Sequence, residues 1–239
     1  MIAVTFNCNI IMLYIIDFDG TLATSDTVDG LLEKFADPAW QVIEEQWLAG
    51  EITAVECMQR QIRMVKADAI TITNFFCAIS LDPYFLPFYR HVNKRAKVAI
   101  VSDGLDYAVH VATRSAHFPA IQVYANHLHF EPDGLDISYP HLNPLCDAGN
   151  GVCKCAVARS LSSVHGGPVV LVGDGKSDAC LARSADVVFA KGSLIEHCER
   201  ENIAYIPFQD FSDVLAVVQG WDIPLPQHAV GYSRYLEQL

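Results

Sequence analysis

The chain is short of positive charge. Its 239 residues include 16 Lys and Arg against 28 Asp and Glu, a formal net charge of −12. A nucleic-acid partner needs a basic face that releases counterions, so this balance argues against nucleic-acid binding. Long apolar runs are also missing, since no stretch approaches the roughly 20 apolar residues of a membrane-spanning helix. Repeats and low-complexity tracts are absent too. We therefore expect neither a nucleic-acid nor a membrane partner.

The N-terminal stretch lacks the basic residues of a secretory signal. We therefore expect a cytoplasmic protein whose eight cysteines are mostly thiols. Residues 1–11 also lack the charge of a soluble helix, and Met12 stands at the start of an apolar run. We expect residues 1–11 to be a dispensable extension.

What the chain does have is an apolar content of 51%, enough for one large core or a main domain with an insert. Its most informative segment is residues 11–22, IMLYIIDFDGTL. The apolar run predicts a buried central strand that stops at Asp17, with a second acid at Asp19. Ligands of open α/β sheets bind just beyond such strand ends. The simpler alternative is a helix cap or a turn, where Asp and Gly are common.

Between residues 26 and 95 the pattern is almost entirely helical. Four helix starts are indicated by Asp37-Pro38, Thr53 with Glu56, Asp68 and Asp82-Pro83. The apolar residues between these starts recur at helical spacing, which is typical of a core and not of a cofactor site.

After residue 97 the pattern changes to strands that alternate with helices. Strand-like runs cover residues 98–101, 121–124, 169–172, 187–189 and, more weakly, 204–206. Residues 130–134 predict a hairpin turn. This alternation predicts an α/β fold, a doubly wound (Rossmann-like) parallel sheet, with a helical insert after the first strand. An insert at that position can roof a site at the strand ends.

Two further polar segments follow predicted strands. Ser102, Asp103 and Gly104 offer a hydroxyl and backbone N–H groups near a helix start, a favourable place for an oxyanion. Asp174 and Asp178 end a later strand and lie about one helical turn apart. Gly173 and Gly175, beside Asp174, let the backbone approach a ligand closely. Lys154 opens a helix after a long loop, where a solvated surface lysine is the simpler explanation.

Over about residues 13–211, the order of these motifs resembles the haloacid dehalogenase superfamily of phosphohydrolases. The motifs are, in chain order, DFDGT, the serine of VSDG, Lys154 and GDGKSD. The resemblance implies a catalytic core of residues 1–22 and 97–239 and a helical C1 cap of residues 23–96. A closer resemblance is to the methionine-salvage phosphatases that act on 2-hydroxy-3-keto-5-methylthiopentenyl-1-phosphate. The similar segments are residues 102–107, 138–141, 189–192 and 206–208 and the cysteines before Lys154. Phosphoethanolamine/phosphocholine phosphatases share the aspartate pattern, so the substrate stays open.

Phosphoryl transfer suits these residues chemically, because its catalysis is chiefly positioning and charge stabilisation. Asp17 is the candidate nucleophile, which would form an aspartyl-phosphate, and Asp19 is the candidate acid and base for the leaving group and the water. Ser102 and Lys154 would hold the non-bridging oxygens. The predicted phosphate site is completed by Gly20, Thr21, Asp103 and Gly104.

Four clustered carboxylates and a phosphate dianion would repel one another without a cation. Hard oxygen ligands favour Mg²⁺ over zinc. By resemblance, Mg²⁺ is bound by Asp17, the backbone carbonyl of Asp19, and Asp174. The resemblance leaves two roles open for Asp178, a ligand through water or a support for the other ligands.

The remaining candidates are weaker. Cys146, Cys153 and Cys155 with His141 could bind zinc, but no C-x-x-C pair is present, and buried or idle thiols or a redox role are the alternatives. We expect His127 and His129 to face solvent on a strand and His197 to be exposed on a helix. Asp26 is either a helix N-cap or, as an acid does at the matching place in phosphoserine phosphatases, a partner for a substrate amino group.

The sequence therefore predicts a Mg²⁺-dependent phosphatase of a small phosphorylated metabolite, acting as a monomer or homodimer. The methionine-salvage phosphate is one candidate substrate, and phosphoserine, phosphoethanolamine and phosphocholine are the others. A dehalogenase is disfavoured because a halide leaving group needs no proton from Asp19. A catalytically idle phosphate-binding regulator is the alternative from a different class.

Overall fold

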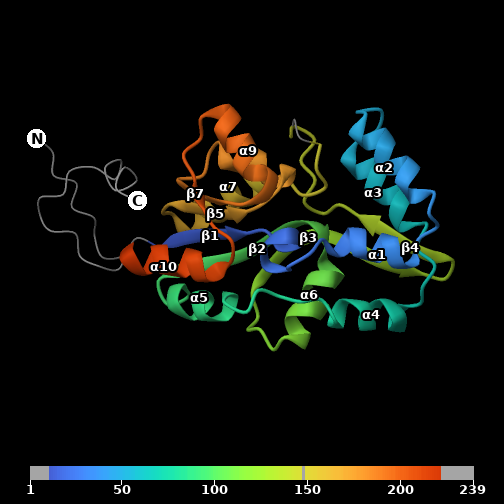
Figure 1. Ribbon diagram of the computed structural model, residues 1–239, viewed down its shortest axis with the longest axis horizontal. Helices are drawn as coiled ribbons and strands as arrows, with labels where there is room; N and C mark the ends of the chain where they lie inside the picture. Colours follow the sequence, from blue (N-terminus) through green and yellow to red (C-terminus); the bar gives the residue numbers. More distant parts are fainter. Residues whose placement is uncertain (1–10, 147–148, 222–239) are drawn as a thin grey trace, which may run out of the picture.

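A seven-stranded sheet organises the computed structural model, which describes residues 11–146 and 149–221 (Figure 1). Its strand order is β4-β3-β2-β1-β5-β6-β7, and every neighbouring pair is parallel except β3 with β4. The strands are β1 (Met12–Ile16), β2 (Ala96–Leu105), β3 (Gln122–Glu131), β4 (Gly134–Ser138), β5 (Val169–Gly173), β6 (Val187–Ala190) and β7 (Ile206–Pro207). The predicted doubly wound α/β fold is confirmed. The N-terminal extension expected at residues 1–11 lies outside the described residues, apart from residue 11.

Helices cover both faces of this sheet (Figure 1). Five of them fall between β1 and β2, as the helical pattern predicts: α1 (Thr27–Phe35), α2 (Trp40–Leu48), α3 (Ala54–Ile62), α4 (Ala69–Cys77) and α5 (Phe85–Val92). The others are α6 (Asp106–Ser115), α7 (Lys154–His165), α8 (Ala179–Ala182), α9 (Gly192–Glu201) and α10 (Phe211–Trp221). Within the described ranges, no helix is both long and apolar enough to cross a membrane.

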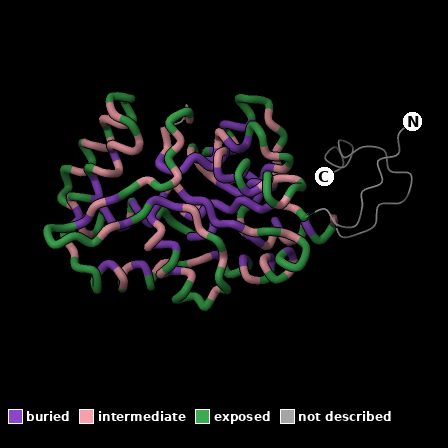
Figure 2. The backbone as a smooth tube through the Cα atoms, turned by 180° about the vertical axis from the view of Figure 1, so that it is seen from behind, coloured by how far each residue is buried: buried purple, intermediate pink, exposed green. Residues whose placement is uncertain are grey.

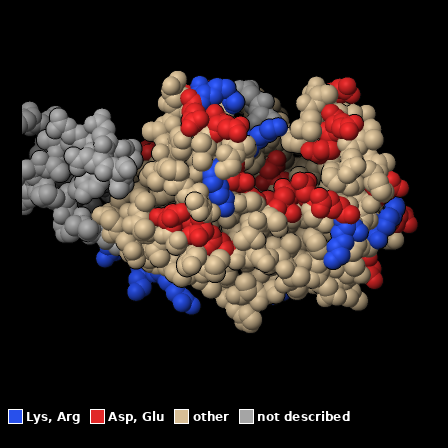
Figure 3. Space-filling view, in the orientation of Figure 1, with Lys and Arg blue, Asp and Glu red and all other residues tan. Residues whose placement is uncertain are grey.

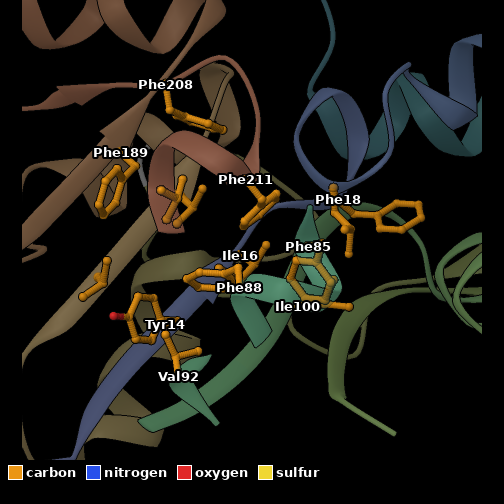
Figure 4. Close-up of a cluster of buried hydrophobic side chains, with 14 of the residues drawn as sticks. Tyr14, Ile16, Phe18, Phe85, Phe88, Val92, Ile100, Phe189, Phe208 and Phe211 are labelled. Atoms are coloured by element: carbon orange, nitrogen blue, oxygen red, sulfur yellow. The ribbon is translucent and has the colours of Figure 1, made fainter. Parts of the chain in front are cut away.

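Strand β1 lies at the centre of the core, where Figure 2 shows the buried backbone concentrated. Leu13 and Ile15 pack with residues of α7, α8 and α9 on one face of the sheet. Tyr14 and Ile16 pack with aromatic residues of α5 and α10 on the other face, among them Phe211 (Figure 4). Burial on both faces explains why the β1 sequence is continuously apolar.

Several boundaries differ from the predicted ones. Strand β2 continues past Val101 through the polar Ser-Asp-Gly segment to Leu105, with a register shift against β3 between those two residues. Helix α5 begins at Phe85, because the Asp82 carboxylate caps the preceding turn at the N–H of Tyr84. The prediction that His197 is exposed is wrong: it is 8% exposed, since its face of α9 packs against the core.

Helices α1, α2 and α3 stand with the β3–β4 hairpin at one end of the sheet (Figure 1). Arg63, just after α3, donates two hydrogen bonds to Asp136 of β4, at 3.2 and 3.1 Å. Tyr139 donates its hydroxyl proton to the carbonyl of Val55 at 2.7 Å. In contrast, α4 packs against α6 and α5 packs against α10. The cap boundary at residues 23–96 stays a prediction.

Candidate active site

The acidic residues of the sequence motifs meet at the carboxyl ends of β1, β2 and β5, where the fold places ligands. Asp17 directly follows β1, Ser102 lies in the last part of β2, and Asp174 directly follows β5. Figure 3 shows acidic side chains gathered where the surface is hollowed. Residues far apart in the sequence are thus brought to one side of the sheet.

Lys154 links two of the acids in a buried ion-pair chain. Its Nζ lies 2.6 Å from Asp17 Oδ1 and 2.6 Å from Asp178 Oδ1, and its side chain is fully buried. The alternative of a solvated surface lysine is therefore wrong. Burial alone would lower the pKa of Lys154, but its two carboxylate partners raise it above the ordinary value. Burial raises the pKa of Asp17 to about 6 and that of Asp178 to about 6, against the opposing effect of the ammonium group.

Carboxylate oxygens of Asp17, Asp174 and Asp178 all lie within 4.8 Å of one another. Thr21 donates its hydroxyl proton to Asp174 Oδ1 at 3.0 Å. Burial, and then the charge of Asp178, raise the pKa of Asp174. Gly20 has φ of +68°, and a Cβ there would stand 2.3 Å from Asp174 Oδ2, so this turn requires glycine. Three acids held this close form a candidate site for a divalent cation.

Asp19 is held by a residue that no sequence motif marks, Thr27 at the start of α1. Asp19 Oδ1 accepts hydrogen bonds from the N–H and the hydroxyl of Thr27, at 2.8 and 2.6 Å, and Oδ2 accepts one from the Ser102 hydroxyl at 3.4 Å. Burial, and then the charge of Asp26, raise the pKa of Asp19 to about 8. A Cβ on Gly104 would stand 2.3 Å from Asp19 Oδ2, so the glycine leaves room for this carboxylate.

Asp103 has its carboxylate turned to the loop before α7. Its Oδ1 accepts a hydrogen bond from the N–H of Val152 at 2.8 Å, and its backbone carbonyl accepts one from Asn126 Nδ2 at 2.6 Å. Burial raises the pKa of Asp103 to about 6. The first bond ties the end of β2 to the loop before Lys154, and the second ties it to β3.

Asp26 caps α1, as one of its two alternatives predicts. Its Oδ1 accepts hydrogen bonds from the N–H groups of Val28 and Asp29, both at 2.9 Å. The residue is exposed and stands directly before Thr27. A cap that uses one oxygen leaves the other, with the charge, for a second role.

Two other neighbours of the site lie outside the catalytic motifs. Asn126 is fully buried on β3, and Lys191 Nζ lies 3.5 Å from the carbonyl of Thr21 and 5.0 Å from the centre of the Phe208 ring. Burial lowers the pKa of Lys191. Lys191 belongs to residues 189–192, which are similar to the methionine-salvage phosphatases, and that similarity points to it.

The cysteines and His141 do not lie together as a zinc site would require. Cys146, Cys153 and Cys155 line one cavity together with Cys180, whereas His141 lines another. Within the described chain, the Asp17–Asp174–Asp178 group is the one cluster of three or more potential ligands that is close enough for a metal ion. His127 is exposed on β3, as expected, and His129 is partly buried with its Nε2 2.8 Å from the Ser138 hydroxyl.

Residues 15–183 match the family of haloacid dehalogenase-like hydrolases. The chain belongs to this family, and it is a hydrolase of phosphoric monoesters.

Two curated relatives are named 2-hydroxy-3-keto-5-methylthiopentenyl-1-phosphate phosphatase. The protein of Exiguobacterium sp. is 28% identical over 213 residues, which are 87% of this chain and 98% of the relative. That of Bacillus mycoides is 31% identical over 206 residues, 84% of this chain and 92% of the relative.

Solved structures of phosphoserine phosphatases share the fold. A substrate-bound complex superposes with a TM-score of 0.66 at 20% identity, covering 89% of this chain and 99% of the other. A phospho-aspartyl intermediate analogue gives a TM-score of 0.64 at 19% identity, covering 88% and 99%.

Proposed function

We propose that this chain hydrolyses a small phosphate monoester through an aspartyl-phosphate on Asp17. The observation that carries the proposal is the meeting of Asp17 and Asp19 with the Ser102 hydroxyl and the Lys154 ammonium at one sheet edge. A carboxylate oxygen of Asp17 attacks phosphorus, the ester oxygen leaves, and water then cleaves the acyl phosphate. Two easier steps replace one very slow hydrolysis.

Asp19 is the proposed proton carrier for both steps. A pKa raised to about 8 keeps its carboxyl group protonated near neutral pH, ready to protonate the leaving alkoxide. The resulting carboxylate then takes a proton from the attacking water. Thr27 fixes the orientation of Asp19 through two hydrogen bonds to one oxygen.

The transferred phosphoryl group needs donors for its non-bridging oxygens. Ser102 and Lys154 are the proposed side-chain donors, and the backbone N–H of Thr21 is retained beside them. The N–H of Gly104 donates to Ser102 Oγ at 2.9 Å and that of Gly20 to the carbonyl of Ser25 at 3.4 Å, so these two glycines orient the site. Lys154 is already neutralised in part by two acids, so it contributes chiefly as a positioned hydrogen-bond donor. For Asp103 we retain a role through its backbone, because its carboxylate is bound to Val152.

The acidic cluster fits Mg²⁺, a hard cation that prefers carboxylate and carbonyl oxygens. Asp17, Asp174 and the backbone carbonyl of Asp19 are the proposed ligands, and the bound ion would offset the charge of the phosphate. Both oxygens of Asp178 already have protein partners, Lys154 on one and the N–H groups of Asp174 and Gly175 on the other. This arrangement favours the supporting role for Asp178 over direct coordination.

For the substrate we propose 2-hydroxy-3-keto-5-methylthiopentenyl-1-phosphate. The support is that relatives of this name align along nearly their whole length. A phosphorylated amine, such as phosphoserine or phosphoethanolamine, is the second candidate. The support for an amine is the negative charge of Asp26, which is exposed and directly precedes Thr27, the residue that binds Asp19.

The first test replaces the nucleophile. Asp17→Asn should lower turnover of p-nitrophenyl phosphate by at least about a thousandfold, about 4 kcal/mol in barrier, because an amide does not attack phosphorus usefully. Circular dichroism should show an intact fold. EDTA should abolish the parent activity and Mg²⁺ should restore it. Residual activity of Asp17→Asn within tenfold of the parent, in a preparation free of other phosphatases, would rule out the nucleophile assignment.

The second test compares substrates on the parent and on Asp26→Asn. Asn caps a helix as well as Asp does, so this variant removes the charge and keeps the cap. For the keto-enol phosphate, kcat/KM should be the highest in a screen that includes the amines. Removing the charge of Asp26 also lowers the pKa of Asp19, which affects every substrate, so Asp26→Asn should change this kcat/KM no more than it changes that of p-nitrophenyl phosphate. A higher kcat/KM for an amine substrate that Asp26→Asn selectively weakens would instead establish the second candidate.

A further inference from the structure

A cavity of about 470 Å³ lies beside the candidate active site, between the start of α7 and α8. Four cysteines line it: Cys146, Cys153, Cys155 and Cys180. Three cationic residues line it as well: Arg159, Lys176 and Arg183. None of these seven residues has a part in the proposed hydrolysis. The cavity thus brings thiols and positive charge together.

Two of these thiols face each other closely. The Sγ atoms of Cys155 and Cys180 lie 2.6 Å apart, although the residues are 25 positions apart in the sequence. Cys155 is 6% exposed, whereas Cys180 is partly exposed, so a reagent in the cavity meets Cys180 first. Cys153 has a different environment, since its sulfur accepts a hydrogen bond from Asn143 at 3.6 Å.

We propose that Cys155 and Cys180 are a reversible redox pair, oxidised to a disulfide by a small anionic disulfide that enters this cavity. The Cys180 sulfur attacks one sulfur of the reagent, whose S–S bond breaks and releases a first thiolate. The Cys155 sulfur then attacks the Cys180 sulfur of the mixed disulfide and releases a second thiolate. The two cysteine protons pass to the two released thiolates. Two protein thiols are oxidised, and one small disulfide is reduced to two thiols.

The charge of the cavity selects the reagent. Arg159 and Arg183 line it without belonging to the hydrolytic site, and Arg183 lies 3.5 Å from Glu201 at the surface. Cationic walls raise the local concentration of anions and repel cations. Oxidised glutathione, which is anionic, should therefore react faster than cystamine, which is a cationic disulfide of similar chemistry.

The crosslink would join the same two segments that the buried ion pair joins. Cys155 follows Lys154, and Cys180 lies two residues after Asp178, while Lys154 Nζ and Asp178 Oδ1 are 2.6 Å apart. Because the sulfur atoms already lie close to bonding distance, the disulfide needs little movement of either segment. It would therefore hold Lys154 against Asp178 and stabilise the folded state.

The experiment treats the full chain with oxidised glutathione, blocks the remaining thiols by alkylation and digests with trypsin without reduction. Trypsin cleaves after Lys154 and Arg159, so Cys155 lies in the peptide CAVAR, apart from Cys153. It also cleaves after Lys176 and Arg183, so Cys180 lies in the peptide SDACLAR. The expected product is CAVAR linked to SDACLAR, which dithiothreitol separates. The oxidised protein should melt about 6–12 °C higher than the reduced one.

Variants identify the order of attack. Cys155→Ser should keep a glutathione adduct on Cys180, whereas Cys180→Ser should give no adduct on Cys155. Cys77→Ser, at an exposed thiol on α4, is the matched control and should give the same linked peptide as the parent. Replacing Arg159 and Arg183 by Gln should slow the reaction with oxidised glutathione about tenfold and speed that with cystamine, because the same walls repel the cationic reagent.

The proposal fails if the linked peptides contain Cys153 or Cys146 in place of Cys155. It also fails if both thiols stay reduced, if a mixed disulfide on Cys180 persists in the parent, or if the crosslinked protein melts at or below the temperature of the reduced one. Peptide mapping and melting do not depend on phosphatase activity, so a failure here is distinct from a failure of the proposed function.

Discussion

Thr27 controls the state of Asp19 although nothing in the local sequence marks it as functional. Its side chain is fully buried, and its hydroxyl and N–H both donate to Asp19 Oδ1. Hydrogen bonds to the ionised form lower a carboxyl pKa, so Thr27 opposes the increase caused by burial. Thr27 thus limits how far burial raises the pKa of Asp19.

Thr27→Val should therefore change the pH dependence as well as the rate. Loss of the hydroxyl raises the Asp19 pKa, so phosphoenzyme formation, which needs the protonated acid, should persist to higher pH. A lost hydrogen bond to a charged group is worth about 1.5–3 kcal/mol, so kcat should fall about 10–100-fold. Single-turnover rates across pH are the measurement, and Thr27→Ser, which keeps the hydroxyl, should resemble the parent. An unshifted profile in Thr27→Val would contradict this role.

The end of β2 shows how one element adapts its shape to the site. The strand continues through Ser102, Asp103 and Gly104, and Gly104 leaves the space that Asp19 Oδ2 fills. A side chain at this position would press on the proton carrier and, at 3.1 Å, on the Ser102 hydroxyl. The glycine is needed for space and not for an unusual backbone angle, because its φ lies outside the left-handed region.

Gly104→Ala should accordingly fold and lose activity. A displacement of about 1 Å at a catalytic group can cost about a hundredfold in rate, and we expect a loss of that order in kcat. Gly175→Ala is the comparison, because a Cβ there meets no atom within 4 Å, and its loss should be at least tenfold smaller. Equal losses in the two variants would show that the backbone, not contact with Asp19, limits this position.

Elements whose signal is local follow from the sequence, and long-range contacts do not. The apolar run before Asp17 predicts β1, and Thr53 and Asp68 cap α3 and α4 as their patterns indicate. The Ser-Asp-Gly part of β2 has the composition of a loop, yet pairing with β3 at Val101 and again at Leu105, on either side of it, keeps it extended. Asn126 and Thr27 act through partners many residues away, which no spacing rule marks.

At the scale of the whole molecule, buried acids make folding stability depend on pH and on metal. Burial raises the pKa of Asp17 and of Asp178 from 3.8 to about 6. Between about pH 4 and pH 6 the folded state then binds more protons than the unfolded chain, so these two groups lower the free energy of unfolding as pH rises through that window. A bound divalent cation would offset the cost at higher pH.

Melting in EDTA should therefore occur at a higher temperature near pH 5 than near pH 7.5, and Mg²⁺ should raise the melting temperature near pH 7.5. Differential scanning calorimetry checks both shifts. Asp178→Asn removes one of the raised carboxyl groups, so its melting temperature should differ less between the two pH values. A melting temperature in EDTA that increases steadily from pH 5 to pH 7.5 would contradict the assignment.

A chimera between relatives must keep the attachment of α3 to the β3–β4 hairpin. Arg63 donates hydrogen bonds to Asp136, and Tyr139 donates one to the carbonyl of Val55. Helix α3 is therefore supported by the β3–β4 hairpin, which comes from a distant part of the chain. The helices between β1 and β2 and the hairpin that supports them are therefore encoded by two separate stretches of the gene. A chimera that swaps only the residues between β1 and β2 would break these contacts. One that also carries residues 122–139 would transfer these helices together with the hairpin that supports them.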